Sequence, residues 1–185
     1  GIKPGNVWIT ATANDYVGKS AKCYLTVIPY IGASSVTALE NNIVLTPGEK
    51  KTVVVKMMPA NTTDSMTWIS QDESVAKVNS STGEITAVAS GKTTVTVMTD
   101  SGKKSTITVT VVGLSRTSLT MQYYSGSIQL YVEGTSEKVR WYSSDDSVVV
   151  VSANGTVSTR GIGTAEIQAV VNGRTLICKV TVVGY

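Results

Sequence analysis

An internal repeat is the feature that most constrains how this chain folds. Residues 68–78, WISQDESVAKV, align without a gap with residues 141–151, WYSSDDSVVVV. Each copy then has a turn containing Gly83 or Gly155, and each closes on the sequence VTVVG. Self-similarity of this kind indicates consecutive copies of one structural unit. The sequence therefore predicts two similar domains, residues 32–113 and residues 114–185.

The first 31 residues match only the end of the repeat. Gly5 and Ile9 are followed by a turn expected within residues 14–18 and by CYLTV, which ends at Val27. Residues 1–31 are thus predicted to be the C-terminal hairpin of a partial repeat or an orphan β segment. Such a hairpin has two unpaired edges, and we expect it to add to an edge of domain 32–113 or of a neighbouring molecule. Solvent-exposed side chains at Ile9, Ala11 and Cys23 would contradict this hypothesis.

The composition and periodicity are those of an all-β protein. The 185 residues include 28 Val, 26 Thr and 12 Ile, β-branched types that favour strands over helices. Alternation directs inward the apolar side chains at positions such as Val95, Val97, Ile107, Val109 and Ile167. Turn signals follow the strands at 47–48, 100–102, 154–155 and 172–173. This pattern predicts two β-sandwiches, each with about seven strands.

Composition also excludes several classes of function. The chain has no His, so a histidine base and imidazole metal ligands are excluded. No Gly-x-Ser-x-Gly motif is present, and we predict that the fragment is not an enzyme and needs no cofactor. The net charge of +3 is spread along the chain rather than clustered, so no nucleic-acid partner is predicted. The longest aliphatic run, residues 148–151, is too short for membrane insertion.

The two cysteines occupy the same position of two repeats. Cys23 and Cys178 each open a strand of the form C-x-x-T-V, where the middle repeat has Ile107. Equivalent core sites one domain apart are too distant for a disulfide, which needs Cα atoms within about 7 Å. We therefore expect two buried free thiols.

The repeated residues resemble the bacterial immunoglobulin-like domains of group 2. The resemblance lies in W-x-S-x-D-x-S-V-A-x-V, then G-x-I-x-A, a further Gly and a closing V-T-V. It implies tandem immunoglobulin-like β-sandwiches, and a setting that is extracellular, on the bacterial cell surface or secreted. Such domains occur in adhesins of the intimin and invasin kind, in secreted polysaccharide-degrading enzymes and in some phage structural proteins.

Exposed aromatic residues are the candidate ligand-binding side chains. Trp8 aligns with Thr94 and Glu166, which alternation directs to solvent, so it is expected to face outward. A second outward set, confined to the last repeat, consists of Tyr123, Tyr124, Tyr131 and Tyr142. Tyrosine offers a large contact area at low entropic cost, which favours binding surfaces. Cross-strand pairing on a sheet is the alternative interpretation.

Other motifs favour structural roles. Trp68 and Trp141 are expected in the sandwich cores rather than as sugar-stacking platforms. Asp72-Glu73 and Asp145-Asp146 could contribute to a Ca²⁺ site between domains, but Asp followed two residues later by Ser is typical of turn capping, and we predict no metal.

The predicted function is that of a non-catalytic rod or spacer module in a bacterial cell-surface protein with a role in cell adhesion. The expected partners are the neighbouring immunoglobulin-like domains and a cell-surface glycan or host protein. Two alternatives remain: direct binding of such a ligand by the last repeat, and an accessory role in a secreted polysaccharide-active enzyme.

Overall fold

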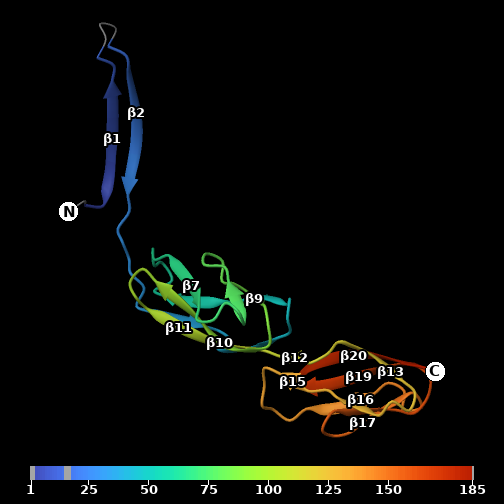
Figure 1. Ribbon diagram of the computed structural model, residues 1–185. Helices are drawn as coiled ribbons and strands as arrows, with labels where there is room; N and C mark the ends of the chain where they lie inside the picture. Colours follow the sequence, from blue (N-terminus) through green and yellow to red (C-terminus); the bar gives the residue numbers. More distant parts are fainter. Residues whose placement is uncertain (1–2, 15–17, 185) are drawn as a thin grey trace.

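The computed structural model describes residues 3–14 and 18–184, which form a β-hairpin followed by two β-sandwiches (Figure 1). The hairpin consists of β1 (Gly5–Thr12) and β2 (Ser20–Val27). Part of its predicted turn, Asp15 to Val17, lies outside the described residues. Among the described residues there is no helix of the length and apolarity needed to cross a bilayer.

The first sandwich contains nine strands. They are β3 (Ser35–Ala38), β4 (Asn42–Leu45), β5 (Lys50–Thr52), β6 (Val55–Met58), β7 (Met66–Ser70), β8 (Ala76–Val78), β9 (Glu84–Ala87), β10 (Gly91–Thr99) and β11 (Lys104–Val111). One sheet has the order β4-β11-β10-β7, the other has the order β5-β9-β8, and β3 pairs with β6. The two larger sheets supply the seven strands that the sequence predicts, and β3 and β6 form an additional ribbon.

The second sandwich repeats this arrangement. Its strands are β12 (Gly113–Leu114), β13 (Ser118–Gln122), β14 (Ser127–Gln129), β15 (Val132–Glu133), β16 (Arg140–Ser143), β17 (Val149–Val151), β18 (Thr156–Thr159), β19 (Gly163–Val171) and β20 (Arg174–Val183). The sheets have the orders β13-β20-β19-β16 and β14-β18-β17, and β12 pairs with β15. In both domains the last strand pairs in parallel with an early strand, β11 with β4 and β20 with β13. The predicted all-β fold of two tandem β-sandwiches is confirmed.

Each sandwich has its own core, built from the side chains that alternation directs inward. Val95, Val97, Ile107 and Val109 are fully buried in the first, and Ile167 is fully buried in the second. Trp68 is buried between the first pair of sheets, and Trp141 packs partly buried in the second domain, as predicted. The strand alternation therefore identifies the cores correctly.

The repeated glycines are explained by contacts with the repeated tryptophans. Gly83 has a φ of +71°, and a Cβ atom there would lie 2.6 Å from the Trp68 indole. Gly155 has a φ of +86°, and a Cβ atom would lie 2.4 Å from the Leu130 carbonyl oxygen and 2.8 Å from the Trp141 indole. At both sites the turn needs a left-handed residue and the ring leaves no room for a side chain. The β19–β20 turn is likewise left-handed at Asn172 and Gly173, as the Asn-Gly signal predicts.

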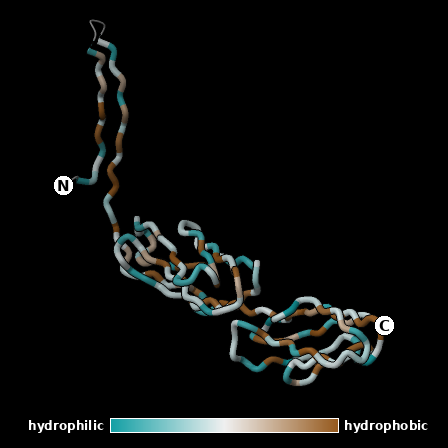
Figure 2. The backbone as a smooth tube through the Cα atoms, viewed as in Figure 1, coloured by the Kyte–Doolittle hydropathy of each residue, from teal (hydrophilic) through white to brown (hydrophobic). Residues whose placement is uncertain are grey.

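The hairpin corrects two predictions. Cys178 is buried, but Cys23 is exposed, so the expectation of two buried thiols is wrong for Cys23. Ile9 and Ala11 are exposed as well, and β1 pairs only with β2. Addition of the hairpin to an edge of domain 32–113 is therefore wrong, whereas its pairing with a neighbouring molecule stays a prediction. The strand pattern specifies which face of a hairpin is apolar, but the cover for that face has to come from other strands. Figure 2 shows the apolar stretches of both strands lying away from the sandwiches.

Candidate functional site

The candidate tyrosines of the second domain form one close pair and two separate residues. Tyr124, Tyr131 and Tyr142 are exposed, but Tyr123 packs partly buried against the second core, so the expectation that it faces outward is wrong. Tyr123 and Tyr124 lie just beyond β13, with ring centroids 3.9 Å apart and planes tilted by 37°. Tyr142 is in β16, at the opposite edge of the same sheet. Tyr131 precedes β15, which pairs with the β12 strand that enters from the first domain. The structure thus brings together Tyr123 and Tyr124, but not Tyr131 or Tyr142.

Trp8 faces solvent on the hairpin, as expected, and it has an aromatic partner. Its register partner is Tyr24 in β2, and the two ring centroids are 4.8 Å apart. Both side chains are exposed, Trp8 by 61% and Tyr24 by 51%. Tyr24 was not among the candidate residues, although the repeat alignment would have placed it opposite Trp8. The pair is the cross-strand contact that stabilises a two-stranded sheet.

The acidic pairs act in turns. In the first domain Asp72 Oδ1 accepts hydrogen bonds from the Ser74 N–H at 2.9 Å and the Ser74 hydroxyl at 2.6 Å. Asp145 accepts the same two bonds from Ser147 at the same distances. These bonds to Ser lower the pKa of both carboxyls. Among the residues that the structure describes, no three acidic or cysteine side chains are grouped to hold a metal ion.

The two sandwiches contact each other through residues that the sequence did not single out, Val44, Gly134 and Arg174 among them. Val112 is fully buried, and its N–H donates to the Leu45 carbonyl at 2.9 Å. Around it lies an apolar cluster of buried Ala169, Val171 and Leu176, lined by partly buried Val44, Leu114, Val132, Val139 and Trp141. Val44 belongs to the first domain, whereas most of the others belong to the second. We call residues 44–49, 112–114, 132–134 and 174–176 the domain junction.

Gly134 allows the backbones of the two domains to approach at the domain junction. A Cβ atom on Gly134, whose φ is +83°, would lie 1.9 Å from the Val111 carbonyl oxygen and 2.8 Å from the Gly91 nitrogen. Gly113 is tightly packed within the first domain, where a Cβ atom would lie 2.4 Å from the Ser90 hydroxyl. Backbone atoms cannot rotate away as a side chain can, so Gly134 specifies close contact between the second domain and the first.

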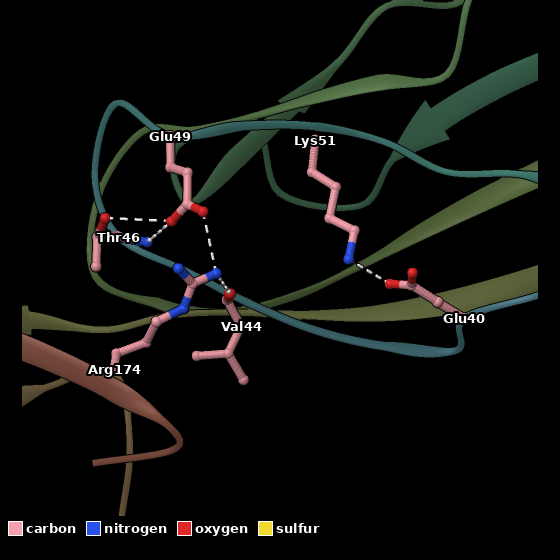
Figure 3. A network of polar contacts seen from close by, with 6 residues as sticks. All are labelled: Glu40, Val44, Thr46, Glu49, Lys51 and Arg174. Carbon is pink, nitrogen blue, oxygen red and sulfur yellow. Dashed lines mark hydrogen bonds and ion pairs between the residues drawn. The ribbon is translucent and has the colours of Figure 1, made fainter. Parts of the chain in front are cut away.

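A polar clamp fixes the domain junction at one side (Figure 3). Arg174, the first residue of β20, donates from Nη2 to the Val44 carbonyl at 2.6 Å and lies 3.0 Å from Glu49 Oε1. Glu49 Oε2 accepts a bond from the Thr46 N–H at 3.0 Å. Burial opposes ionisation of Glu49, but the Thr46 N–H and the Arg174 charge outweigh it and lower the pKa of this carboxyl. The clamp joins residues 130 positions apart in the chain.

A second polar cluster attaches the hairpin linker to the first sandwich. Asp64 is 8% exposed, and it accepts hydrogen bonds from the Tyr30 hydroxyl at 2.6 Å, from the Ala33 N–H at 3.0 Å and from both the N–H and the hydroxyl of Ser101. Burial raises the pKa of Asp64, but the donors outweigh it and hold that pKa well below its ordinary value. Thr63 and Ile31 add three more: the Ile31 N–H donates to the Thr63 hydroxyl oxygen, and the Thr63 N–H and hydroxyl both donate to the Ile31 carbonyl. Both oxygens of the buried Asp64 carboxylate accept hydrogen bonds, Oδ1 from Tyr30 and Oδ2 from Ala33 and Ser101, which is the arrangement of a structural anchor.

Comparison with known protein families identifies both sandwiches. The family model described as bacterial Ig-like domain (group 2) matches residues 33–112 and 114–182. An uncharacterized protein of Clostridium acetobutylicum is 31% identical over 139 residues, 69% of this chain and 35% of the relative. The lacto-N-biosidase of Bifidobacterium bifidum is 39% identical over 67 residues, 36% of this chain and 6% of that enzyme. The chain thus spans little more than a third of the length of the first relative and far less of the enzyme.

The chain is also similar, at low sequence identity, to solved structures. A C-terminal fragment of intimin, solved in complex with the intimin-binding domain of the translocated intimin receptor, has a TM-score of 0.48 and 18% identity, covering 82% of this chain and 64% of that one. Domains 4–9 of the surface layer protein SbsC have a TM-score of 0.37 and 17% identity, covering 100% of this chain and 36% of that one.

Proposed function

Because the chain belongs to the family of bacterial Ig-like domains of group 2, we propose that its two sandwiches form a stiff, non-catalytic spacer in an extracellular bacterial surface protein with a role in cell adhesion. The observation that carries this proposal is the domain junction. Its linker residue Val112 is buried, Gly134 contacts the backbone of the other domain, and Arg174 spans the two sandwiches. A linker held in this way cannot act as a flexible tether.

A spacer of this kind supplies reach. The nine-residue strands β10 and β19 each extend about 30 Å at about 3.3 Å per residue. With the loops at the domain ends included, two domains in line add about 60 to 80 Å between the anchor and the module that they carry. Thr-rich outer strand faces, such as those of β10 and β11, suit a surface that stays hydrated.

The stiffness can be measured by the spread of distances between two spin labels. Glu73 and Asp146 are exposed and occupy equivalent turns of the two domains, so cysteines at both sites can be labelled in a Cys23→Ser background. Double electron–electron resonance should give a single narrow distance distribution. A broad distribution in this parent protein would contradict the spacer proposal.

A pair of glycine variants tests whether the domain junction is the cause. Gly134→Ala should broaden or shift the distribution, because the new Cβ meets the Val111 carbonyl. Gly126→Ala is the matched control: its φ is +95°, in the same domain, but no atom lies within 4 Å of the added Cβ. The control should therefore leave the distance unchanged. An unchanged distribution in Gly134→Ala would show that the contact does not fix the domains.

The match to lacto-N-biosidase favours a second candidate, an accessory segment of a secreted polysaccharide-active enzyme. The complete reading frame of the parent protein distinguishes the two, since a catalytic domain in it would support the accessory role.

Direct ligand binding by the last domain is tested on immobilised glycans and extracellular-matrix proteins. Saturable binding that Tyr142→Ala abolishes would replace the spacer proposal with a binding function.

A further inference from the structure

The hairpin β1–β2 has the strand register of the final hairpin of a complete sandwich. In β1–β2, Gly5 pairs with Val27 and Ile9 pairs with Cys23. In β19–β20, Gly163 pairs with Val182 and Ile167 pairs with Cys178. The leading glycines also share one backbone conformation, with φ values of 153° at Gly5, 155° at Gly91 and 152° at Gly163. The hairpin is thus a third copy of the same structural element.

The face that corresponds to the sandwich core is apolar in the hairpin, but it is uncovered. Its six positions are Val7, Ile9, Ala11, Cys23, Leu25 and Val27, and the equivalents in the second domain are Ala165, Ile167, Ala169, Cys178, Val180 and Val182. Four of the six residue types are the same. Ile167 and Cys178 are fully buried, whereas Ile9 is 53% exposed and Leu25 is 44% exposed.

The complete domains show which strands cover this face. The outer edge of β20 pairs in parallel with β13, and the outer edge of β19 pairs antiparallel with β16. The opposite sheet, β14-β18-β17, contributes fully buried Val149 and Val157 to the core. The hairpin has the same two edges and the same face, and in the described chain no other strand pairs with either edge.

We propose that β1–β2 is a complementing hairpin: it binds a polypeptide segment that carries the front strands of a group 2 sandwich, those equivalent to β12–β18, and completes that sandwich. This differs from addition to an intact sheet edge, because the segment covers the face and both edges together. The front strands of the two sandwiches in this chain are already paired with their own final hairpins, β10–β11 and β19–β20, so they are not free to bind β1–β2. Two hairpins from two copies could cover each other's faces, but they would not supply the parallel and antiparallel edge partners.

The test uses the full chain and a synthetic peptide of residues 114–162, the front strands that match the most similar core face. Added to the chain, the peptide should bind in a 1:1 complex and slow amide hydrogen exchange in β1 and β2 by about tenfold or more. Ile9→Asp should abolish binding, because it puts a charge into the new core. Thr10→Asp, on the outward face of the same strand, is the control and should bind as the parent does.

A fusion protein that carries the peptide covalently attached to the chain avoids aggregation of the free peptide. Residues 114–162 are fused so that Ile162 precedes Gly5, as it precedes Gly163 in the second domain. The fused chain should show a third cooperative unfolding unit, which Ile9→Asp abolishes and Thr10→Asp retains.

Three results would overturn the proposal. The first is the absence of both binding and a third folded unit. The second is binding that is insensitive to Ile9→Asp, with exchange altered in β19–β20 instead, which would mean strand exchange into the second domain. The third is concentration-dependent dimerisation of the chain alone that Ile9→Asp abolishes, which would make a second copy the occupant.

Discussion

Replacing Gly83 by Ala tests the reason for one of the repeated glycines. The added Cβ would lie 2.6 Å from Cε2 and Cζ2 of Trp68, a side chain that is 3% exposed and packed in the first core. Gly102, in the same domain, has a similar φ of +81° but no atom within 4 Å of an added Cβ. Gly102→Ala therefore reports the backbone cost alone, and the difference between the two variants reports the contact with the indole.

The expected magnitudes follow from these two contributions. A left-handed conformation costs an L-residue about 1 to 2 kcal/mol, which applies to both variants. Overpacking a filled core adds about 1 to 3 kcal/mol, which applies only to Gly83→Ala. The free energy of unfolding should therefore fall by about 1 to 2 kcal/mol in Gly102→Ala and by about 2 to 5 kcal/mol in Gly83→Ala. Each kcal/mol lowers the Tm of a domain of this size by about 4 to 8 °C.

The measurement is urea unfolding of the full chain, followed by NMR signals of β10 and β11 amides, with β19 and β20 amides as the internal reference. In the double variant Gly83→Ala, Trp68→Leu the extra cost should shrink, because the smaller side chain makes room for the methyl group. Equal destabilisation by Gly83→Ala and Gly102→Ala would refute the reasoning. An unrelieved cost in the double variant would do the same.

Three further predictions concern titratable groups. The hydrogen bond that Tyr30 donates to Asp64 raises the pKa of the phenol, so Asp64→Asn should lower that pKa toward 10, as followed by NMR of the Tyr30 ring; an unchanged value would contradict the bond. Because the folded pKa of Asp64 lies below the unfolded value of about 3.9, the anchor it forms should persist from neutral pH to about 4 and weaken only as the pH falls further. If the Ala33 and Ser101 amide signals instead shifted with a midpoint near pH 4, the pKa of Asp64 would not be lowered in the folded chain. Iodoacetamide should modify exposed Cys23 in the native chain and spare Cys178, whose thiol is buried with its pKa raised by that burial; equal reaction at both sites would show that the second core opens readily.

Local features of the sequence were sufficient for the strands and cores. Alternation at Val95, Val97 and Ile107 identified the buried face because a strand directs successive side chains to opposite sides. The turns at Gly155 and at Asn172-Gly173 could be predicted because a left-handed backbone favours these residue types. The repeat also predicts that the hairpin corresponds to the last two strands of a sandwich, because its apolar residues alternate as they do in β19 and β20.

The candidate site was less predictable. The aromatic residues were expected to be exposed, and Tyr124, Tyr131 and Tyr142 are, whereas Tyr123 is partly buried against the second core. The separation of the tyrosines across the second domain depends on the strand order of the sheet. Strand order places β13 and β16 at opposite edges, and no local pattern encodes it. Tyr24 was missed because its importance arises only from pairing with Trp8.

The sequence by itself determined the two sandwiches, their cores and the apolar face of the hairpin, because these follow from side-chain periodicity within short segments. Only the tertiary structure decided how the units are joined. Arg174 contacts Val44 and Glu49, and Asp64 contacts Tyr30 and Ser101, through bonds between residues distant in the chain. The tertiary structure also decided that Cys178 is buried while Cys23, in the same position of its repeat, is exposed. A pattern specifies which way a side chain points, whereas burial requires a second layer of strands, and that layer comes from elsewhere in the fold.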